Sequence, residues 1–233
     1  MPTGLIISLL DYILNTHSSP GPAAMQLLDI MYQDDELVAI NKPSGWLVHR
    51  SPIDKHETRF VLQTLRNQLG RHVFPLHRLD KPTSGVLVFA LFSKAASFYS
   101  QQFCEQQIRK TYLALVRGYA PSQMNIDHPL TDEADEYAGI AKGGDAKPAL
   151  NHTMRMQQFE IPLQVGRYPS TRLSLMQCQP VTGRKHQIRH HLKHIGHPLV
   201  SDSRPGQGLV ELCLWGLFWS RAFVAGVHPD GAD

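Results

Sequence analysis

Cysteine is scarce in this sequence, and long hydrophobic runs are absent. Three cysteines occur among 233 residues, none in C-x-x-C spacing: Cys104, Cys178 and Cys213. An odd set without that spacing argues against a disulfide framework or a thiolate zinc site and indicates a reducing compartment, so we expect a cytoplasmic protein. The apolar run Leu5–Leu14 is too short to span a bilayer and contains Asp11, so we expect no membrane association.

Charge is also sparse. Charged residues make up 18% of the chain and hydrophobic residues 42%, which excludes coiled-coil, collagen-like and acidic-tail classes. The net charge of +3 is too small to identify a partner by itself. The chain is long enough to bury a core. Because residues 16–24 read THSSPGPAA, a linker composition, we expect a flexible extension over 1–24 before a folded domain over 25–202.

Strand-like segments outnumber helical ones in the folded part. The continuous apolar run Gly85–Leu91 is typical of a strand buried on both faces. Helical spacing predicts one helix over Val61–Leu69, ended by Gly70, a second from Ser93 to about Gln107, and a third from about Arg184 to Ile195. Most strands are hairpin-spaced, so we predict an α+β fold with a mixed, mostly antiparallel central sheet, flanking helices and a central active-site cleft.

The sharpest local feature is an ionisable cluster directly before the most hydrophobic strand. It reads His77-Arg-Leu-Asp80-Lys-Pro-Thr-Ser-Gly85. Because Asp80 precedes Lys81-Pro82, it is biased toward an extended or turn conformation. Two interpretations stay open: the carboxylate caps its own turn by accepting main-chain N–H groups from Thr83 or Ser84, or a rigid loop presents it as a reactive group.

A second cluster lies in the expected third helix. Lys185, Arg189 and Lys193 recur at i, i+4 and i+8 and would share one cationic stripe. Residues 181–204 carry five Lys or Arg and one acid, a local charge above that of the whole chain. A phosphate backbone is the natural counterpart, and a merely solvated basic helix is the alternative.

The same helix imitates a zinc-protease motif in His186-Gln-Ile-Arg-His190. Gln187 stands where that motif needs a carboxylate base, and the neighbouring cations disfavour a dication. We therefore predict no metal site, although a zinc hydrolase remains a formal rival whose prediction is stoichiometric bound zinc.

Taken together, four ordered motifs resemble the RluA-type family of pseudouridine synthases. They are Asn41-Lys42-Pro43-Ser44-Gly45 with His49, the His77–Gly85 loop, Lys110 with Tyr112-Leu-Ala-Leu, and Gly183-Arg184-Lys185-His186-Gln187-Ile188-Arg189. Residues 45–51 and 166–169 are most similar to the branch of that family that modifies the uridine at position 65 in the T stem of tRNA.

The resemblance implies the pseudouridine synthase fold and an isomerase that flips a uridine out of RNA. It implies catalytic roles for Asp80 as the carboxylate, Tyr112 as the ring-stacking proton acceptor and Arg184 as the partner of the carboxylate. It implies RNA contacts at Lys42, His77, Arg78, Lys185, Ile188, Arg189 and Lys193. The expected partner is tRNA, with no cofactor, no metal, no obligatory protein partner and a monomeric enzyme.

The resemblance ends after Asp202. Members of the family continue through a Leu-His-Ala element and a His-Pro turn, whereas residues 203–233 contain only His228-Pro229 of these. We therefore expect an atypical tail over 203–233. Two rival hypotheses follow, a catalytically impaired RNA-binding remnant of the family and a synthase that acts on another tRNA or rRNA uridine.

Overall fold

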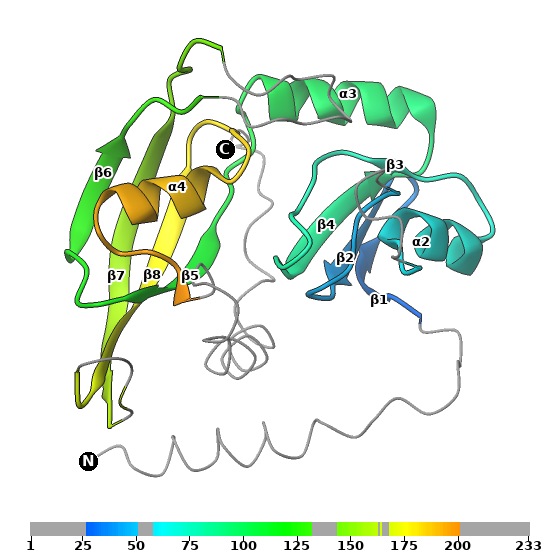
Figure 1. Ribbon diagram of the computed structural model, residues 1–233. Helices are drawn as coiled ribbons and strands as arrows, with labels where there is room; N and C mark the ends of the chain where they lie inside the picture. The colour runs from blue at the N-terminus through cyan, green and yellow to red at the C-terminus, as the bar shows by residue number, and fades with distance from the viewer. Residues whose placement is uncertain (1–26, 51–57, 132–143, 163, 165–167, 201–233) are drawn as a thin grey trace, which may run out of the picture. The chain divides into compact units, whose positions relative to one another are not determined.

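The computed structural model describes residues 27–50, 58–131, 144–162, 164 and 168–200. These residues fall into two compact units that divide after Gln107, and each unit is built on its own four-stranded sheet (Figure 1). The α+β class expected from the sequence is confirmed. The expected extension and the expected tail lie outside the described residues.

The first unit contains an antiparallel sheet in the order β1-β2-β4-β3. Its strands are β1 (Asp29–Gln33), β2 (Leu37–Lys42), β3 (Phe74–Pro75) and β4 (Gly85–Ala90). The central pair β2 and β4 runs in register from Leu37 opposite Ala90 to Lys42 opposite Gly85. This register places the beginning of the Asn41–Gly45 motif beside the end of the ionisable loop at Gly85.

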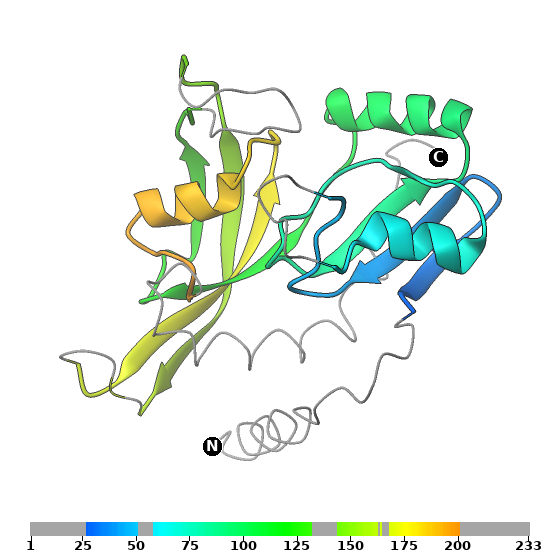
Figure 2. The same ribbon diagram turned by 45° about the vertical axis from the view of Figure 1, so that its right-hand side comes forward.

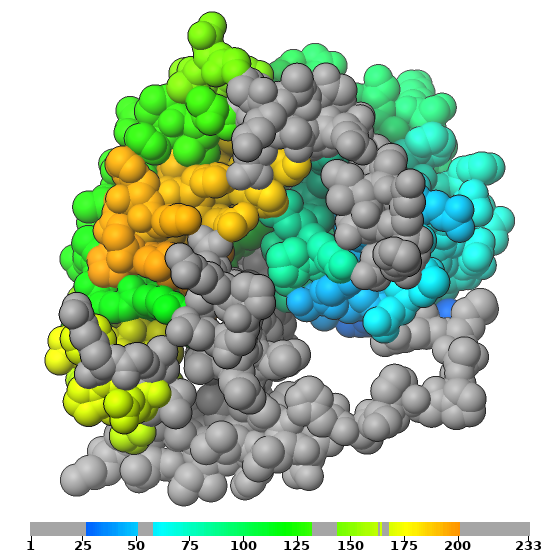
Figure 3. Space-filling model, viewed as in Figure 1, coloured from blue at the N-terminus to red at the C-terminus, as the bar shows by residue number. Residues whose placement is uncertain are grey.

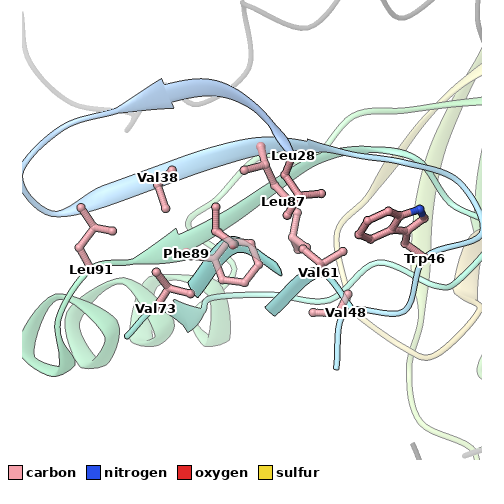
Figure 4. Packing of buried hydrophobic residues seen from close by; sticks show 11 residues of the cluster. Leu28, Val38, Trp46, Val48, Val61, Val73, Leu87, Phe89 and Leu91 are labelled. Carbon is pink, nitrogen blue, oxygen red and sulfur yellow. The ribbon is translucent and has the colours of Figure 1, made fainter. Parts of the chain in front are cut away.

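The continuous apolar run forms strand β4 as predicted, and this strand is fully buried on one face and partly buried on the other. Leu87 and Phe89 pack with Val38 and Val61 on the face covered by α2 (Val61–Leu69), as Figure 4 shows. Val88 and Ala90 alternate to the other face and pack against α3 (Ser93–Cys104). Helix α2 ends as predicted at Gly70, whose φ of 64° is the left-handed conformation that glycine adopts readily.

The second unit contains an antiparallel sheet in the order β5-β8-β7-β6. Its strands are β5 (Tyr112–Arg117), β6 (Gln123–Asp127), β7 (Leu150–Ile161) and β8 (Thr171–Pro180). Helix α4 (Gln187–His194) lies against one face of this sheet in both ribbon views (Figures 1 and 2). Leu192 of α4 belongs to one core cluster with Val116 and Met176.

The third helix begins later than the sequence pattern predicts. It starts at Gln187 rather than near Arg184, because His186 adopts a left-handed conformation with φ of 53°. Lys185 and Arg184 therefore precede the helix, and the expected stripe of Lys185, Arg189 and Lys193 along a single helix is wrong. Only Arg189 and Lys193 lie on α4.

His191 is a buried polar residue of α4, on the side that faces the sheet. Its side chain is fully buried, and its Nε2 donates a hydrogen bond of 2.9 Å to the carbonyl of His128. The Nδ1 atom has no hydrogen-bond partner among the described residues. Burial lowers the pKa of His191 from 6.5, and the nearby His128, His194 and His190 lower it further, although the bond to His128 opposes the shift.

This burial makes the stability of the second unit depend on pH. In the unfolded chain His191 takes up a proton near pH 6.5, whereas the folded chain resists it to lower pH, so the free energy of unfolding falls as pH drops below 6.5. We expect His191→Gln to weaken this dependence, because glutamine can still donate to the His128 carbonyl and does not titrate. Urea unfolding at several pH values measures the effect.

The matched control is His152→Gln, which replaces an exposed histidine of β7 in the same unit. It should leave the acid limb of the wild-type curve largely in place. A His191→Gln protein whose stability falls with acid as steeply as that of the wild type would contradict the assignment.

Candidate active site

The ionisable loop of the first unit joins β3 to β4, and His77 fastens its beginning. The Nε2 atom of His77 accepts a hydrogen bond of 3.2 Å from the main-chain N–H of Val88. The imidazole also stacks on Phe103 of α3, with ring centroids 5.1 Å apart. The ring is thus held between the sheet and a helix, at the point where the chain leaves the sheet.

The middle of the loop is a tight turn closed by main-chain groups. The N–H of Thr83 donates to the carbonyl of Asp80 at 3.0 Å. Asp80 itself is exposed, as is Arg78, while Leu79 between them packs against the hydrophobic core. A half-buried residue between two exposed ones fixes the direction in which both charged side chains leave the surface.

The first sequence motif, Asn41 to Gly45, is bound to this turn. The N–H of Gly45 donates to the carbonyl of Lys81 at 2.8 Å, and the hydroxyl of Ser44 donates to the carbonyl of Pro82 at 2.7 Å. Gly45 has a φ of 81°, a left-handed conformation that would strain any other residue. The two motifs, about forty positions apart in the chain, therefore form one local structure.

Lys42 lies at the centre of that structure. Its side chain has no exposed surface, and its Nζ donates to the carbonyls of Trp46 at 2.8 Å, Pro43 at 2.9 Å and Lys81 at 3.2 Å. All three donors of the ammonium are thus used within the protein. This geometry makes Lys42 a clamp between the Asn41–Gly45 motif and the Asp80 turn.

Two opposing effects act on the pKa of the buried Lys42 ammonium. Burial lowers the pKa of Lys42 from 10.5 to about 8, and the negative charge of Asp80 opposes that shift. The ammonium and the carboxylate are therefore close enough to interact electrostatically. A cation in this position favours the ionised form of a neighbouring carboxyl group.

We expect Lys42→Met to remove a specific pH dependence. Since the folded pKa lies near 8 and the unfolded value near 10.5, the unfolded chain binds more protons between them, and the stability contributed by this group rises with pH. The wild type should therefore gain about 2 kcal/mol relative to Lys42→Met between about pH 7 and pH 9.5. Chemical denaturation across this range measures the difference.

Lys94→Met is the control, because Lys94 is an exposed lysine on α3 of the same unit. Its stability should follow the wild type across the same pH range. Parallel curves for the wild type and Lys42→Met would refute the buried ammonium.

In the second unit, the loop before α4 carries Arg184. The Nε atom of Arg184 donates to the carbonyl of Pro148 at 3.2 Å, and its main-chain N–H donates to Oε1 of Gln187 at 3.0 Å. Both contacts bind this half-buried arginine to ordered parts of the unit, namely the residues just before β7 and the first residue of α4. The guanidinium is thus placed by the loop and not by helical periodicity.

Tyr112 opens β5 in the same unit, opposite Cys178 of β8. It is half-buried and packs against the cluster beneath α4. Two positions earlier, the ammonium of Lys110 lies 3.9 Å from the point where a Cβ of Gly183 would stand. The start of β5 and the loop of Arg184 are therefore neighbours, and burial lowers the pKa of Lys110.

The expected RNA contacts divide into exposed and enclosed side chains. Arg78, Lys185, Arg189 and Lys193 are exposed. Figure 3 shows the atoms of α4, in orange, at the surface of the molecule. Ile188 is half-buried against the core of the second unit, whereas Lys42 and His77 are engaged within the first.

The described part of the chain contains neither a metal-binding cluster nor a membrane-spanning helix. No group of three or more His, Cys, Asp or Glu side chains there is arranged to hold a metal ion. No helix in that part is long and apolar enough to cross a bilayer.

The sequence interpretation missed one side chain near Arg184 that the structure emphasises. The sequence analysis assigns Gln187 no role beyond the missing carboxylate of a zinc motif and a place in the last family motif, yet its side chain is 4% exposed and bonded to four groups. The available signal was its place one residue before the apolar position Ile188, where a polar residue needs buried partners.

Comparison with known proteins identifies the family of this fold and site. Residues 36–194 match the model of the RNA pseudouridylate synthase family, and the chain belongs to that family. A tRNA pseudouridine synthase C of Vibrio cholerae is 50% identical over 78% of this chain and 76% of its own length. A tRNA pseudouridine synthase C of Pectobacterium carotovorum is also 50% identical, over 79% of this chain, which spans only 50% of that protein.

Solved structures agree with this assignment. Human RNA Pseudouridylate Synthase Domain Containing 1 superposes with a TM-score of 0.62 at 26% identity, covering 81% of this chain and 74% of that one. Human RNA Pseudouridylate Synthase Domain Containing 4 gives a TM-score of 0.56 at 27% identity, covering 75% and 67%. The resemblance to the pseudouridine synthases found in the sequence motifs is therefore confirmed.

Proposed function

We propose that this chain is an RNA pseudouridine synthase that isomerises a uridine in tRNA, at position 65 of the T stem. The observation that carries the proposal is the exposed Asp80, held in a main-chain turn that a buried ammonium clamps from below. The relatives named tRNA pseudouridine synthase C support tRNA as the substrate class. The reaction needs no cofactor, because the same atoms are rejoined in a new order.

Asp80 is the group that acts on the nucleoside in this proposal. Conversion of uridine breaks the N1–C1′ bond, turns the uracil over and joins C5 to C1′. Bond cleavage develops positive charge on the sugar, which an ionised carboxylate stabilises or captures, as in glycoside hydrolysis. Lys42 contributes by bonding to the carbonyl of Lys81 behind the turn, which fixes the loop that carries the carboxylate.

Tyr112 and Arg184 complete the proposed catalytic set. Arg184 would pair with the carboxylate of Asp80 when the substrate is bound, and its planar guanidinium suits such a pair. Tyr112 would stack on the uracil, and its hydroxyl would take the proton that C5 must lose. Both side chains lie in one unit, at the start of β5 and in the loop before α4.

The remaining expected residues handle the RNA. The target base leaves its stack at a cost of about a few kcal/mol, and the exposed guanidinium of Arg78 can stack or pair in the vacated space. Lys185, Arg189 and Lys193 would neutralise phosphates, and Ile188 would line the base pocket. For Lys42 and His77 we propose indirect RNA roles, since their hydrogen bonds hold the Asp80 loop.

Asp80→Asn tests the chemical role. We expect formation of pseudouridine to fall by about 100-fold or more, because the amide carries no negative charge, while tRNA affinity changes little. Chemical mapping of pseudouridine in unmodified tRNA, with binding measured in parallel, gives both quantities. The control is Asp35→Asn, an exposed aspartate in the turn between β1 and β2.

Two results would count against the proposal. A wild-type chain that binds tRNA and forms no pseudouridine would favour the impaired remnant. An Asp80→Asn enzyme as fast as Asp35→Asn would remove Asp80 from the chemistry. Product at a different uridine would correct the position and keep the reaction.

The cationic face of α4 makes a separate prediction. Arg189→Ala and Lys193→Ala should each weaken tRNA binding and lower the slope of log affinity against log salt by about 1, because each phosphate contact releases counterions. Binding measured at several salt concentrations checks this. Arg172→Ala is the control, since that arginine on β8 is exposed and pairs with Glu160 at 3.4 Å. Slopes equal to that of the wild type in both α4 variants would disprove the phosphate contacts.

A further inference from the structure

The loop that carries Arg184 has no helical support of its own. Helix α4 begins only at Gln187, and His186 before it is left-handed. Residues 182–186 therefore lack the regular i to i−4 hydrogen bonds that would otherwise fix them. Their conformation must be determined by other contacts, and those contacts converge on one side chain.

That side chain is Gln187, whose amide is fully used. Its Oε1 accepts from the hydroxyl of Thr182 at 2.7 Å and from the main-chain N–H of Arg184 at 3.0 Å. Its Nε2 donates to the carbonyl of Leu150 at 3.0 Å and to Oδ1 of Asn151 at 2.8 Å. A carboxamide has two acceptor and two donor sites, and here all four are satisfied.

The contacts of Gln187 join the loop to the beginning of β7. The main-chain N–H of Leu150 donates to the hydroxyl of Thr182 at 3.1 Å, which closes a network of Thr182, Gln187 and the first two residues of the strand. Arg184 also bonds to this segment through Pro148. Gln187 is 4% exposed and Asn151 has no exposed surface, so water does not replace these bonds easily.

We propose that Gln187 is a positioning residue, whose buried amide fixes the Thr182–His186 loop on β7 and thereby directs the side chain of Arg184. This inference rests on the proposed catalytic role of Arg184. Gln187 does not touch the reacting atoms. Its contribution is to order the loop in advance, so that the guanidinium of Arg184 does not have to be ordered when substrate binds.

The first test uses Gln187→Leu, which keeps the approximate volume and removes all four hydrogen bonds. We expect the single-turnover rate of pseudouridine formation to fall by about 10- to 100-fold, since a small displacement of a catalytic group costs that much. Affinity for tRNA should stay within about threefold, because two of the three proposed phosphate-binding side chains, Arg189 and Lys193, lie on α4 and only Lys185 lies in the loop. Gln158→Leu, an exposed glutamine on β7, is the matched control.

The second test uses Gln187→Glu at different pH values. A protonated carboxyl group keeps one of the two donors of the amide and an acceptor oxygen, whereas a carboxylate has no donor and sets an oxygen against the Leu150 carbonyl. The ratio of its rate to that of the wild type should therefore rise as pH falls, and the ratio for Gln187→Leu should not. The charged side chains of Lys110 and Arg184 next to the loop oppose protonation, and His186 is the adjacent titratable group.

A third measurement does not depend on activity. Hydrogen exchange of the Arg184 amide reports directly on its bond to Gln187, and exchange of the Met176 amide reports on the sheet beneath. In Gln187→Leu, the melting temperature should fall because buried partners lose their hydrogen bonds. The Arg184 amide should exchange faster by a larger factor than the Met176 amide. Unchanged exchange at Arg184, or equal acceleration at both amides, would overturn the positioning role.

The two proposals can fail separately. If the wild-type chain makes no pseudouridine, the proposed function fails, and the exchange experiment still decides whether Gln187 orders the loop. If the wild type is active and Gln187→Leu matches Gln158→Leu in rate, the positioning role fails and the proposed function stands.

Discussion

The ammonium of Lys42 is the group on which the organisation of the first unit depends. It lies without exposed surface between two loops and donates to three carbonyl oxygens, one of them in the turn after Asp80. Burying a charge is costly unless every donor is satisfied, so the loops must adopt the conformation that brings those carbonyls together. The buried ammonium of Lys42 therefore also orders the Asp80 turn.

In the second unit, a neutral buried side chain orders the loop instead of a charged one. There the loop of Arg184 is tied to the sheet by the amide of Gln187, which both donates and accepts. In both units a buried polar side chain bonds to main-chain groups of a loop that carries an exposed or half-buried charged residue. The placement of Asp80 and of Arg184 therefore depends on the main-chain bonds of their loops as well as on their own side-chain rotamers.

Much of this could be predicted from the sequence, because the strongest signals were local. The apolar run of β4 and the Gly70 stop of α2 depend on composition and on a single conformational preference, and both predictions were confirmed. The order of the family motifs was likewise readable. The start of α4 was not, because the left-handed residue before it is His186, and non-glycine residues rarely adopt that conformation.

The sequence predicted the residue types of the candidate site better than it predicted their contacts. The sequence indicated Asp80, Tyr112 and Arg184 by resemblance, and their catalytic roles stay proposals. It could not indicate that Lys42 points inward, because lysine is almost never fully buried and one of its three partners, the carbonyl of Lys81, is 39 positions away. The contacts of Gln187 could not be predicted for a similar reason, since two of its four partners lie 36 and 37 positions away.

The anchoring of the Asp80 turn through carbonyl oxygens has an evolutionary consequence. Lys42, Ser44 and Gly45 bind main-chain atoms of Lys81 and Pro82, and every amino acid supplies such a carbonyl. Mutations that alter side chains on the rim of the turn therefore leave its scaffold in place. In the course of evolution the exposed positions of this loop can therefore be substituted without displacing the turn that carries the carboxylate of Asp80.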